Sequence, residues 1–369
     1  MKLQIKRVEV FGVAMPLIGT FTSAGISKDT TKCVVIRLTA ADGTVGISSI
    51  EPSATAKSPG TAAELMVTLR DKVAPAMIGL DATNVHHLIE LMDKLTPTQP
   101  GAGAAAEMAC VDLVARSLGV PIHTYLGGAV HTRLEFNGWI GMLEPEAAAA
   151  DAQRWLKAGF RSAKIKVGSG VEADRDRVAA VRDAVGSAMQ LRIDANTLYD
   201  ADTSLELCKL VKRFDLQFFE QPAPKDDIAG LARVRRLGGI PVMADESISD
   251  HPSLIKVIKA DAADFIKFGI KQAGGILRAS RMLATAQAAG LPCVIGHGFG
   301  LDPSTLAEIM LSASSRNVVA GLECVGPLKV TDSVATTRLD ISSASIALPD
   351  GPGLGIELDE AKLEKYRFN

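Results

Sequence analysis

Short apolar segments alternate with longer amphipathic segments through the second two thirds of the chain, and this alternation constrains the fold more than any other feature. Eight of the apolar segments have the length and composition of strands: LEFNGWI, SAKIKV, QLRIDAN, LQFFEQP, IPVMADES, ADFIKFGI, LPCVIGH and VVAGLEC. Asp194, Glu220 and Asp245 stand near the ends of three successive segments, 26 and 25 residues apart. A period of about 25 residues is typical of one strand and its helix, so the sequence predicts a (β/α)8-type TIM barrel.

The first third of the chain has a different pattern. Residues 2–39 alternate with period two except between Gly19 and Lys32, so we expect two strands joined by a mobile loop. Residues 62–118 change to helical spacing. We therefore expect an α/β protein with an α+β N-terminal capping domain over residues 1–125, the barrel over 126–326, and a C-terminal segment, 327–369, that returns to the capping domain.

Composition excludes several classes of protein. With 369 residues the chain is too long to fold around a single hydrophobic core. Its 40 basic and 42 acidic residues give a net charge of −2. This balance, without long runs of like charge, argues against binding to nucleic acid or to a membrane surface. The five cysteines lack C-x-x-C spacing, and no segment has the pattern of a signal peptide or membrane span, so we expect a cytoplasmic protein.

Polar residues at the carboxyl ends of the predicted strands are candidates for the active site, because barrel enzymes place their sites there. Period-two alternation directs Lys164 and Lys166 into the barrel, and it directs the carboxylates of Asp194, Glu220 and Asp245 to one rim of its mouth. Three carboxylates this close raise one another's pKa unless a cation joins them. Oxygen ligands without His or Cys favour a hard cation, and Mg²⁺ fits best. Each carboxylate alone is also explained as a helix cap, and each lysine as an ion-pair partner.

The ordered motifs K-x-K (Lys164, Lys166), D-x-N (Asp194, Asn196), E-Q-P (Glu220), D-E-S (Asp245, Glu246) and G-G-I (274–276) resemble those of the enolase superfamily, in its mandelate racemase and muconate lactonizing enzyme branch. The resemblance covers essentially the whole chain. It implies a Mg²⁺ held by the three carboxylates, removal of the proton beside a substrate carboxylate, and a metal-stabilised enolate. It also implies a small carboxylate substrate and a homo-oligomer.

Residue roles follow from the same resemblance. Lys166 is expected to act as base or acid on one face, and Lys164 to contact the substrate carboxylate and favour the neutral form of Lys166. Asn196 and Glu246 are expected to orient these groups. Glu323 corresponds to a carboxylate that some relatives direct at the substrate, and Phe21 to a lid residue that sets specificity.

The second face of the site departs from the family pattern. Relatives carry a lysine or an aspartate five residues before the paired glycines, where this chain has Gly269. Lys267 lies two residues earlier, and His297 occupies a seventh-strand position without its usual aspartate partner. His297 and Lys267 are therefore rival candidates for the second acid or base, and Lys271 is a weaker one.

The resemblance implies an isomerase acting by racemisation or cycloisomerisation. The alternatives are an acid-sugar dehydratase that works by β-elimination, a Schiff-base aldolase that uses a barrel lysine, and a catalytically inactive barrel that binds a ligand. The last is motivated by the missing residue at Gly269.

Overall fold

The computed structural model describes residues 2–23, 26–52, 61–296 and 298–368. Within them, the first part of the chain forms an antiparallel sheet of order β13-β1-β2-β3. Its strands are β1 (Ile5–Ser23), β2 (Ile26–Ala40), β3 (Val45–Ile50) and β13 (Arg367–Phe368). Gly12 of β1 pairs with Phe368 of β13, so the C-terminal segment lies against the first strand of the chain.

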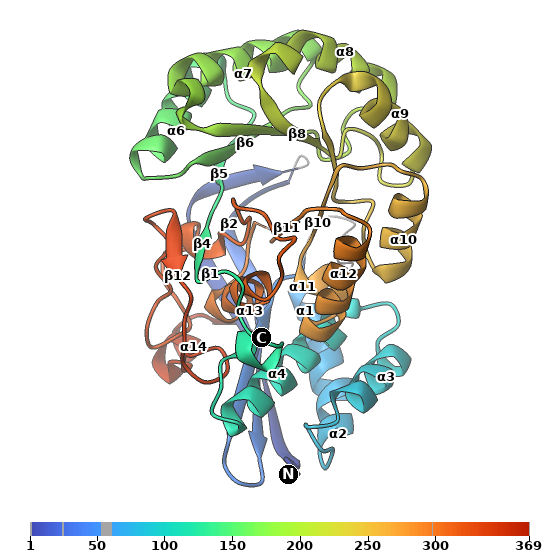
Figure 1. Cartoon of the computed structure of the whole chain (residues 1–369). Coiled ribbons are helices and arrows are strands. Elements are labelled where there is room, and N and C mark those ends of the chain that lie inside the picture. The colour runs from blue at the N-terminus through green and yellow to red at the C-terminus, as the bar shows by residue number, and fades with distance from the viewer. Residues whose placement is uncertain (1, 24–25, 53–60, 297, 369) are drawn as a thin grey trace.

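The segment between Gly19 and Lys32 is mostly strand, and the expectation of a mobile loop there was wrong. The β1–β2 ladder runs from Ile5 opposite Ala40 to Ser23 opposite Ile26, with a register shift between Pro16 and Phe21, and it places Phe21 opposite Lys28. The sequence did not predict these strands because their residues are small and polar, whereas the backbone hydrogen bonds that form a ladder do not require apolar side chains. Residues 24–25 lie outside the described part. Figure 1 shows the hairpin extending from the capping sheet toward the barrel strands.

Helices cover one side of the capping sheet (Figure 1). They are α1 (Ala62–Thr68), η1 (Leu69–Val73), α2 (Ala74–Met77), α3 (Val85–Leu95), α4 (Pro100–Ser117) and α5 (Ile122–Tyr125). The alanine-rich α4 is buried along most of its length and packs on β3. A Cβ at Gly46 of β3 would lie 2.3 Å from the carbonyl oxygen of Ala109, so only glycine permits this close approach.

The barrel strands form a parallel sheet of order β11-β10-β9-β8-β7-β6-β5. Their bounds are β5 (Gly138–Ile140), β6 (Ser162–Lys166), β7 (Gln190–Asp194), β8 (Leu216–Glu220), β9 (Val242–Ala244), β10 (Phe265–Phe268) and β11 (Cys293–Ile295). The helices that follow them are α6 (Pro145–Lys157), α7 (Val171–Val185), α8 (Ala201–Val211), α9 (Ile228–Gly238), α10 (His251–Lys259), α11 (Ile270–Ala273), α12 (Ile276–Ala288) and α13 (Asp302–Ala313). Figure 1 shows α6 to α10 arching over the outside of these strands.

The eighth barrel position is occupied without a regular strand. Two isolated bridges, Cys293 with Val318 and Phe136 with Leu322, join residues 318–322 to both sides of the gap. The predicted strand VVAGLEC therefore lies in the right place but lacks a continuous ladder. The predicted first strand is also divided, because β4 (Arg133–Glu135) pairs with β12 (Ser345–Ala347) and only β5 joins the barrel.

Side chains fill the lower part of the barrel. Phe218, Met243 and Val294 form a small apolar cluster. The fully buried Arg192 contacts the Phe218 ring and donates hydrogen bonds to the carbonyl oxygens of Ala320 and Gly321. Arg192 thus fixes the irregular eighth segment to β7. In the part of the chain that the structure describes, no helix combines the length and apolar character needed to cross a bilayer.

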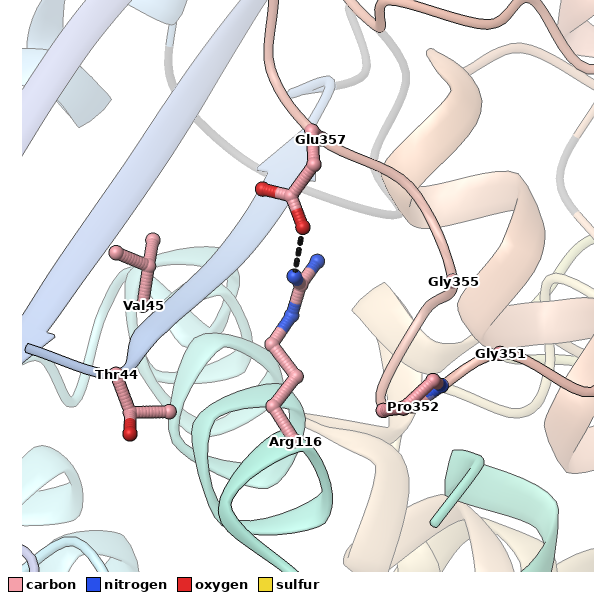
Figure 2. A pocket seen from close by; sticks show the side chains of 7 residues that line it. All are labelled: Thr44, Val45, Arg116, Gly351, Pro352, Gly355 and Glu357. Atoms are coloured by element: carbon pink, nitrogen blue, oxygen red, sulfur yellow. Dashed lines mark hydrogen bonds and ion pairs between the residues drawn. The ribbon is translucent and has the colours of Figure 1, made fainter. Parts of the chain in front are cut away.

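Short elements complete the chain: η2 (Gly186–Ala188), η3 (Lys212–Phe214), η4 (Gly326–Leu328) and α14 (Glu360–Lys365). The C-terminal segment docks on α4, where Arg116 pairs with Asp112 and Glu357. Figure 2 shows the Arg116–Glu357 pair in a cleft between the end of α4 and residues 351–357. None of the predicted site residues lines this cleft, so we assign it to the attachment of the segment.

Candidate active site

Three neighbouring strands bring the predicted carboxylates together. Lys166 of β6 pairs with Asp194 of β7, and Asp194 pairs with Glu220 of β8. Asp245 directly follows β9, the next strand in the sheet. The alternation read from the sequence therefore places these side chains at the carboxyl ends of adjacent strands, as a barrel site requires.

Two buried lysines join the carboxylates. Lys164 Nζ lies 3.1 Å from both Asp194 Oδ2 and Glu220 Oε2. Lys267 Nζ lies 2.9 Å from Glu220 Oε1 and 3.3 Å from Asp245 Oδ2. Lys267 thus lies among the carboxylates, and each neighbouring pair of carboxylates is bridged by one ammonium group.

Glu323 belongs to the same cluster. Its Oε2 lies 2.5 Å from Lys164 Nζ and 2.6 Å from Lys267 Nζ. Its buried Oε1 accepts no hydrogen bond from the described residues, with Arg192 at 3.8 Å. The irregular eighth segment therefore delivers a carboxylate into the barrel, with one oxygen open to a further donor.

The pKa values of the cluster follow from burial and charge. Burial raises the pKa of Glu220 to about 8, together with the charges of Asp194 and Glu323, and the lysines only partly offset this. Burial acts the same way on Glu323, but Lys164 and Lys267 overcome it and lower its pKa to about 2. Burial lowers the pKa of Lys164 and Lys267, yet the surrounding carboxylates raise both above the usual value. Both lysines are therefore held as ammonium ions.

Lys166 differs from these two lysines in its exposure. Its side chain is 26% exposed, against 7% for Lys164. Its Nζ lies 2.6 Å from Asp194 Oδ2 and also donates to Asn196 Oδ1. Asn196 in turn donates to Glu246 Oε1 at 3.1 Å, so this chain of contacts orients the accessible amine. These contacts link Asn196 and Glu246 to Lys166, while their orienting role and the catalytic role of Lys166 stay predictions.

The donor set fits a hard divalent cation by its chemistry. Asp194, Glu220 and Asp245 offer only oxygen and are fully buried. Among the described residues no three His, Cys, Asp or Glu side chains are already spaced as metal ligands. The ammonium groups of Lys164 and Lys267 lie between the carboxylates instead. A metal ion would therefore have to displace at least one of these ammonium groups.

The second face offers fewer groups. Gly269 begins α11, and its amide donates to Gln272 Oε1. Lys271 lies in that short helix and donates to the backbone carbonyl of Glu51 at 2.7 Å, away from the carboxylates. His297 lies outside the described residues, so its role as second acid or base stays a prediction.

Sequence reasoning named Phe21 but missed Lys329, whose amine lies among three aromatic rings. The Lys329 amine lies 4.5 Å from the Trp139 ring, 4.2 Å from Phe299 and 5.5 Å from Phe21. Phe21 stands in β1 rather than in a loop, but it does reach the barrel, because its ring lies 6.4 Å from that of Trp139. No local motif marks Lys329, which the sequence places in the C-terminal segment.

Comparisons with known proteins agree with this architecture. A family model described as mandelate racemase/muconate lactonizing enzyme, N-terminal domain, matches residues 5–127, and one described as enolase C-terminal domain-like matches residues 147–362. An L-Ala-D/L-Glu epimerase of Bacillus subtilis is 31% identical, covering 96% of this chain and 97% of its own. An N-succinyl-L-Arg/Lys racemase of Bacillus cereus is 27% identical, covering 98% of both chains.

Solved structures give the same result. The N-succinyl Arg/Lys racemase of Bacillus cereus superposes with a TM-score of 0.94 at 26% identity, covering 100% of this chain and 99% of its own. The muconate lactonizing enzyme of Pseudomonas fluorescens, complexed with muconolactone, gives 0.92 at 26% identity and covers 100% of both chains. The fold and site define an enzyme of the enolase superfamily with a capping domain and a TIM-type barrel. Within that superfamily, the chain belongs to the mandelate racemase/muconate lactonizing enzyme family, whose relatives here are isomerases.

Proposed function

We propose that this protein is a Mg²⁺-dependent isomerase in which Lys166 removes the proton beside the carboxylate of a small substrate. The observation that carries the proposal is the position of Lys166, a partly exposed amine beside a buried carboxylate cluster. The relatives named as racemases, epimerases and cycloisomerases support the isomerase class.

Charge balance supports the involvement of a divalent cation. The cluster contains the carboxylates of Asp194, Glu220, Asp245 and Glu323, and the cations Lys164, Lys166, Lys267 and Arg192. With Glu220 protonated, as a pKa of about 8 implies at neutral pH, and with Lys166 neutral as a base requires, three carboxylates and three cations remain and their charges cancel, so the cluster has no surplus positive charge for an anionic substrate. Mg²⁺ held by Asp194, Glu220 and Asp245 would supply two positive charges for the substrate carboxylate and the charge that develops beside it, and would compete with Lys166 for Asp194.

The protein's own residues divide the remaining work. Lys166 accepts the α-proton in its neutral form, and Asn196 holds its Nζ in place. Lys164 and Lys267 remain charged and stabilise the negative charge that spreads onto the carboxylate of the substrate. The capping hairpin places Phe21 over the site, where its ring excludes water from the reacting carbon.

The described residues favour removal of the α-proton from one face of the substrate only, the face of Lys166. On the sixth strand Gly269 supplies no side chain, and Lys267 is occupied by three carboxylates. If His297 does not act from the opposite side, the enzyme is a one-base isomerase of the cycloisomerase type. If His297 does act, both enantiomers of a substrate exchange their α-protons, as two-base racemisation requires.

Solvent exchange tests the proposal. N-acyl-L- and N-acyl-D-amino acids are incubated in D₂O with the protein and Mg²⁺, and deuterium at the α-carbon is followed by NMR. We expect exchange of at least one enantiomer, its loss in Lys166→Ala, and its loss on adding EDTA. Glu206→Gln, on the exposed face of α8, is a control that should leave exchange unchanged. Unchanged exchange of every enantiomer in Lys166→Ala would refute the assignment of the base, whereas loss for one enantiomer alone would assign the other enantiomer to His297.

A further inference from the structure

Lys329 is a buried lysine whose position the proposed chemistry does not explain. It directly follows η4, and its backbone carbonyl accepts a hydrogen bond from the amide of Ile18 in β1. The adjacent Val330 bridges to Leu17. The backbone is thus fixed to the capping sheet, while the side chain, in a residue only 7% exposed, reaches the barrel mouth.

Among the described residues, the amine of Lys329 contacts a carbonyl oxygen and three aromatic rings, none of which carries a formal charge. Its Nζ donates to the carbonyl oxygen of Gly298 at 2.6 Å, and the rings of Trp139, Phe299 and Phe21 surround it. No carboxylate of the described residues forms an ion pair with it. The other buried lysines of the site, Lys164 and Lys267, each contact three carboxylates. A buried amine without a counter-ion is costly to maintain.

The aromatic rings connect Lys329 to the reacting centre. Trp139 of β5 is the register partner of Lys164 in β6, so Trp139 lies next to one of the two buried lysines of the site. Phe299 is shared with Lys28 of β2, whose Nζ lies 3.9 Å from the ring centre. Lys28 is itself paired with Glu51 at 2.7 Å. Lys28, Lys329 and the rings of Trp139, Phe299 and Phe21 therefore form one group, called the roof below, and within the described residues Lys329 is the one of its two amines without a carboxylate partner.

A structural role explains the rings but not the amine. A methionine would fill the same aromatic surroundings without a buried polar group. Burial, followed by the charges of Lys166 and Lys164, lowers the pKa of Lys329 to about 7, and the more distant carboxylates of Glu51 and Glu323 only partly oppose this. The surroundings of this amine therefore lack one negative charge.

We propose that Lys329 binds a second anionic group of the substrate, distal to the carboxylate beside the reacting carbon, and so selects dianionic substrates. This inference rests on the proposed function for the position of the reacting carboxylate. The distal anion supplies the counter-ion that Lys329 lacks, and the three rings contact the carbon chain that joins the two anionic groups. Lys329 is a specificity residue in this scheme and takes no part in the proton transfer.

Matched ligands test the inference. N-malonyl-, N-succinyl- and N-glutarylglycine carry a distal carboxylate at three chain lengths, and N-butyrylglycine replaces that carboxylate of the succinyl compound with a methyl group. Binding is measured by calorimetry with Mg²⁺ at pH 7. We expect at least one dianion to bind tenfold or more tightly than N-butyrylglycine. In Lys329→Met this preference should disappear while N-butyrylglycine affinity changes less than threefold.

Two further variants keep the result interpretable. Lys329→Arg retains a cation and should keep the preference, whereas Lys256→Met, on the exposed side of α10, removes a charge far from the roof and should behave as wild type. Equal or absent binding of all four compounds by the wild type, or a preference that survives in Lys329→Met, would overturn the inference. If Lys329→Met does not fold, loss of the preference in Lys329→Arg would also count against it.

Deuterium exchange at the glycine carbon of the same compounds separates the two proposals. At subsaturating concentrations, exchange of N-butyrylglycine as fast as that of each of the three dianions would support the proposed function and refute the role of Lys329. A binding preference without exchange of any compound would support the role of Lys329 and refute the proposed proton abstraction.

Discussion

Replacing Lys329 with methionine should change how stability depends on pH, and the structure gives the size of the effect. Burial and the nearby ammonium groups lower the pKa of this lysine to about 7, against about 10.4 in an unfolded chain. Between pH 7 and about pH 10.4 the Lys329 amine is therefore protonated in the unfolded state but largely neutral in the folded state. The free energy of unfolding of the wild type therefore rises with pH in this window, relative to a variant without the amine.

The magnitude follows from the width of the window. Between pH 7 and pH 9.5 the relative gain is about 3 kcal/mol, at about 1.4 kcal/mol for each pH unit. At roughly 2.1 cal/mol/K of unfolding entropy per residue, this corresponds to about 4 °C in melting temperature for a chain of 369 residues. We expect Lys329→Met to melt above the wild type at pH 7, and this advantage to shrink by that amount at pH 9.5.

Thermal melts without ligand, at matched scan rates, measure the difference between the two proteins at each pH. Other titrating groups are common to both and cancel from the comparison. Lys256→Met, which removes an exposed ammonium, should show no such trend. A melting difference between Lys329→Met and the wild type that stays constant from pH 7 to pH 9.5 would refute the assignment of Lys329 as a buried amine without a counter-ion.

Three other changes probe the carboxylate cluster and its support. Mg²⁺ at 100 times its Kd should stabilise the wild type by about 2.7 kcal/mol, and Glu220→Gln should lose this effect; an unchanged metal-dependent melting shift would exclude Glu220 as a ligand. Lys267→Met removes an ammonium group that lies between the carboxylates of Glu220 and Asp245 and so competes with Mg²⁺ for them. Calorimetric titration should therefore show that this variant binds Mg²⁺ at least tenfold more tightly than the wild type. Weaker binding would mean that Lys267 orients these two carboxylates. Gly296→Ala should lower the free energy of unfolding by about 2 kcal/mol or more in denaturant melts, because the added Cβ would lie 2.3 Å from the carbonyl carbon of Glu323 and the backbone has φ of +129°. Stability equal to that of the wild type would show that the eighth segment moves to accommodate the added methyl group.

The sequence predicted the barrel and its carboxylates because both depend on local regularities. The period of about 25 residues places strand ends at one rim, and period-two alternation directs Lys164 and Asp194 inward. The length of the β1–β2 hairpin was not predictable in this way, since its outer part pairs through the backbone and carries small polar residues. The irregular eighth position, fixed by Arg192 rather than by a ladder, also leaves no periodic trace.

Interactions between distant parts of the chain set the remaining features. Whether Lys267 reaches the carboxylates or the space beside Gly269 depends on the depth of Glu220 and Glu323 in the barrel, which strand spacing does not give. Lys329 acquires its surroundings from Phe21, more than 300 residues earlier in the chain, from Trp139 of β5 and from the barrel loop that carries Phe299. Neither arrangement corresponds to a motif.

The pairing of β13 with β1 imposes an order on assembly during translation. The edge of β1 at Gly12 receives its partner only when Phe368 has been synthesised, after every barrel strand. Until then the nascent capping sheet presents an open edge, to which a second nascent chain could add a strand. Shielding of that edge while the ribosome completes the barrel should therefore limit the yield of folded protein.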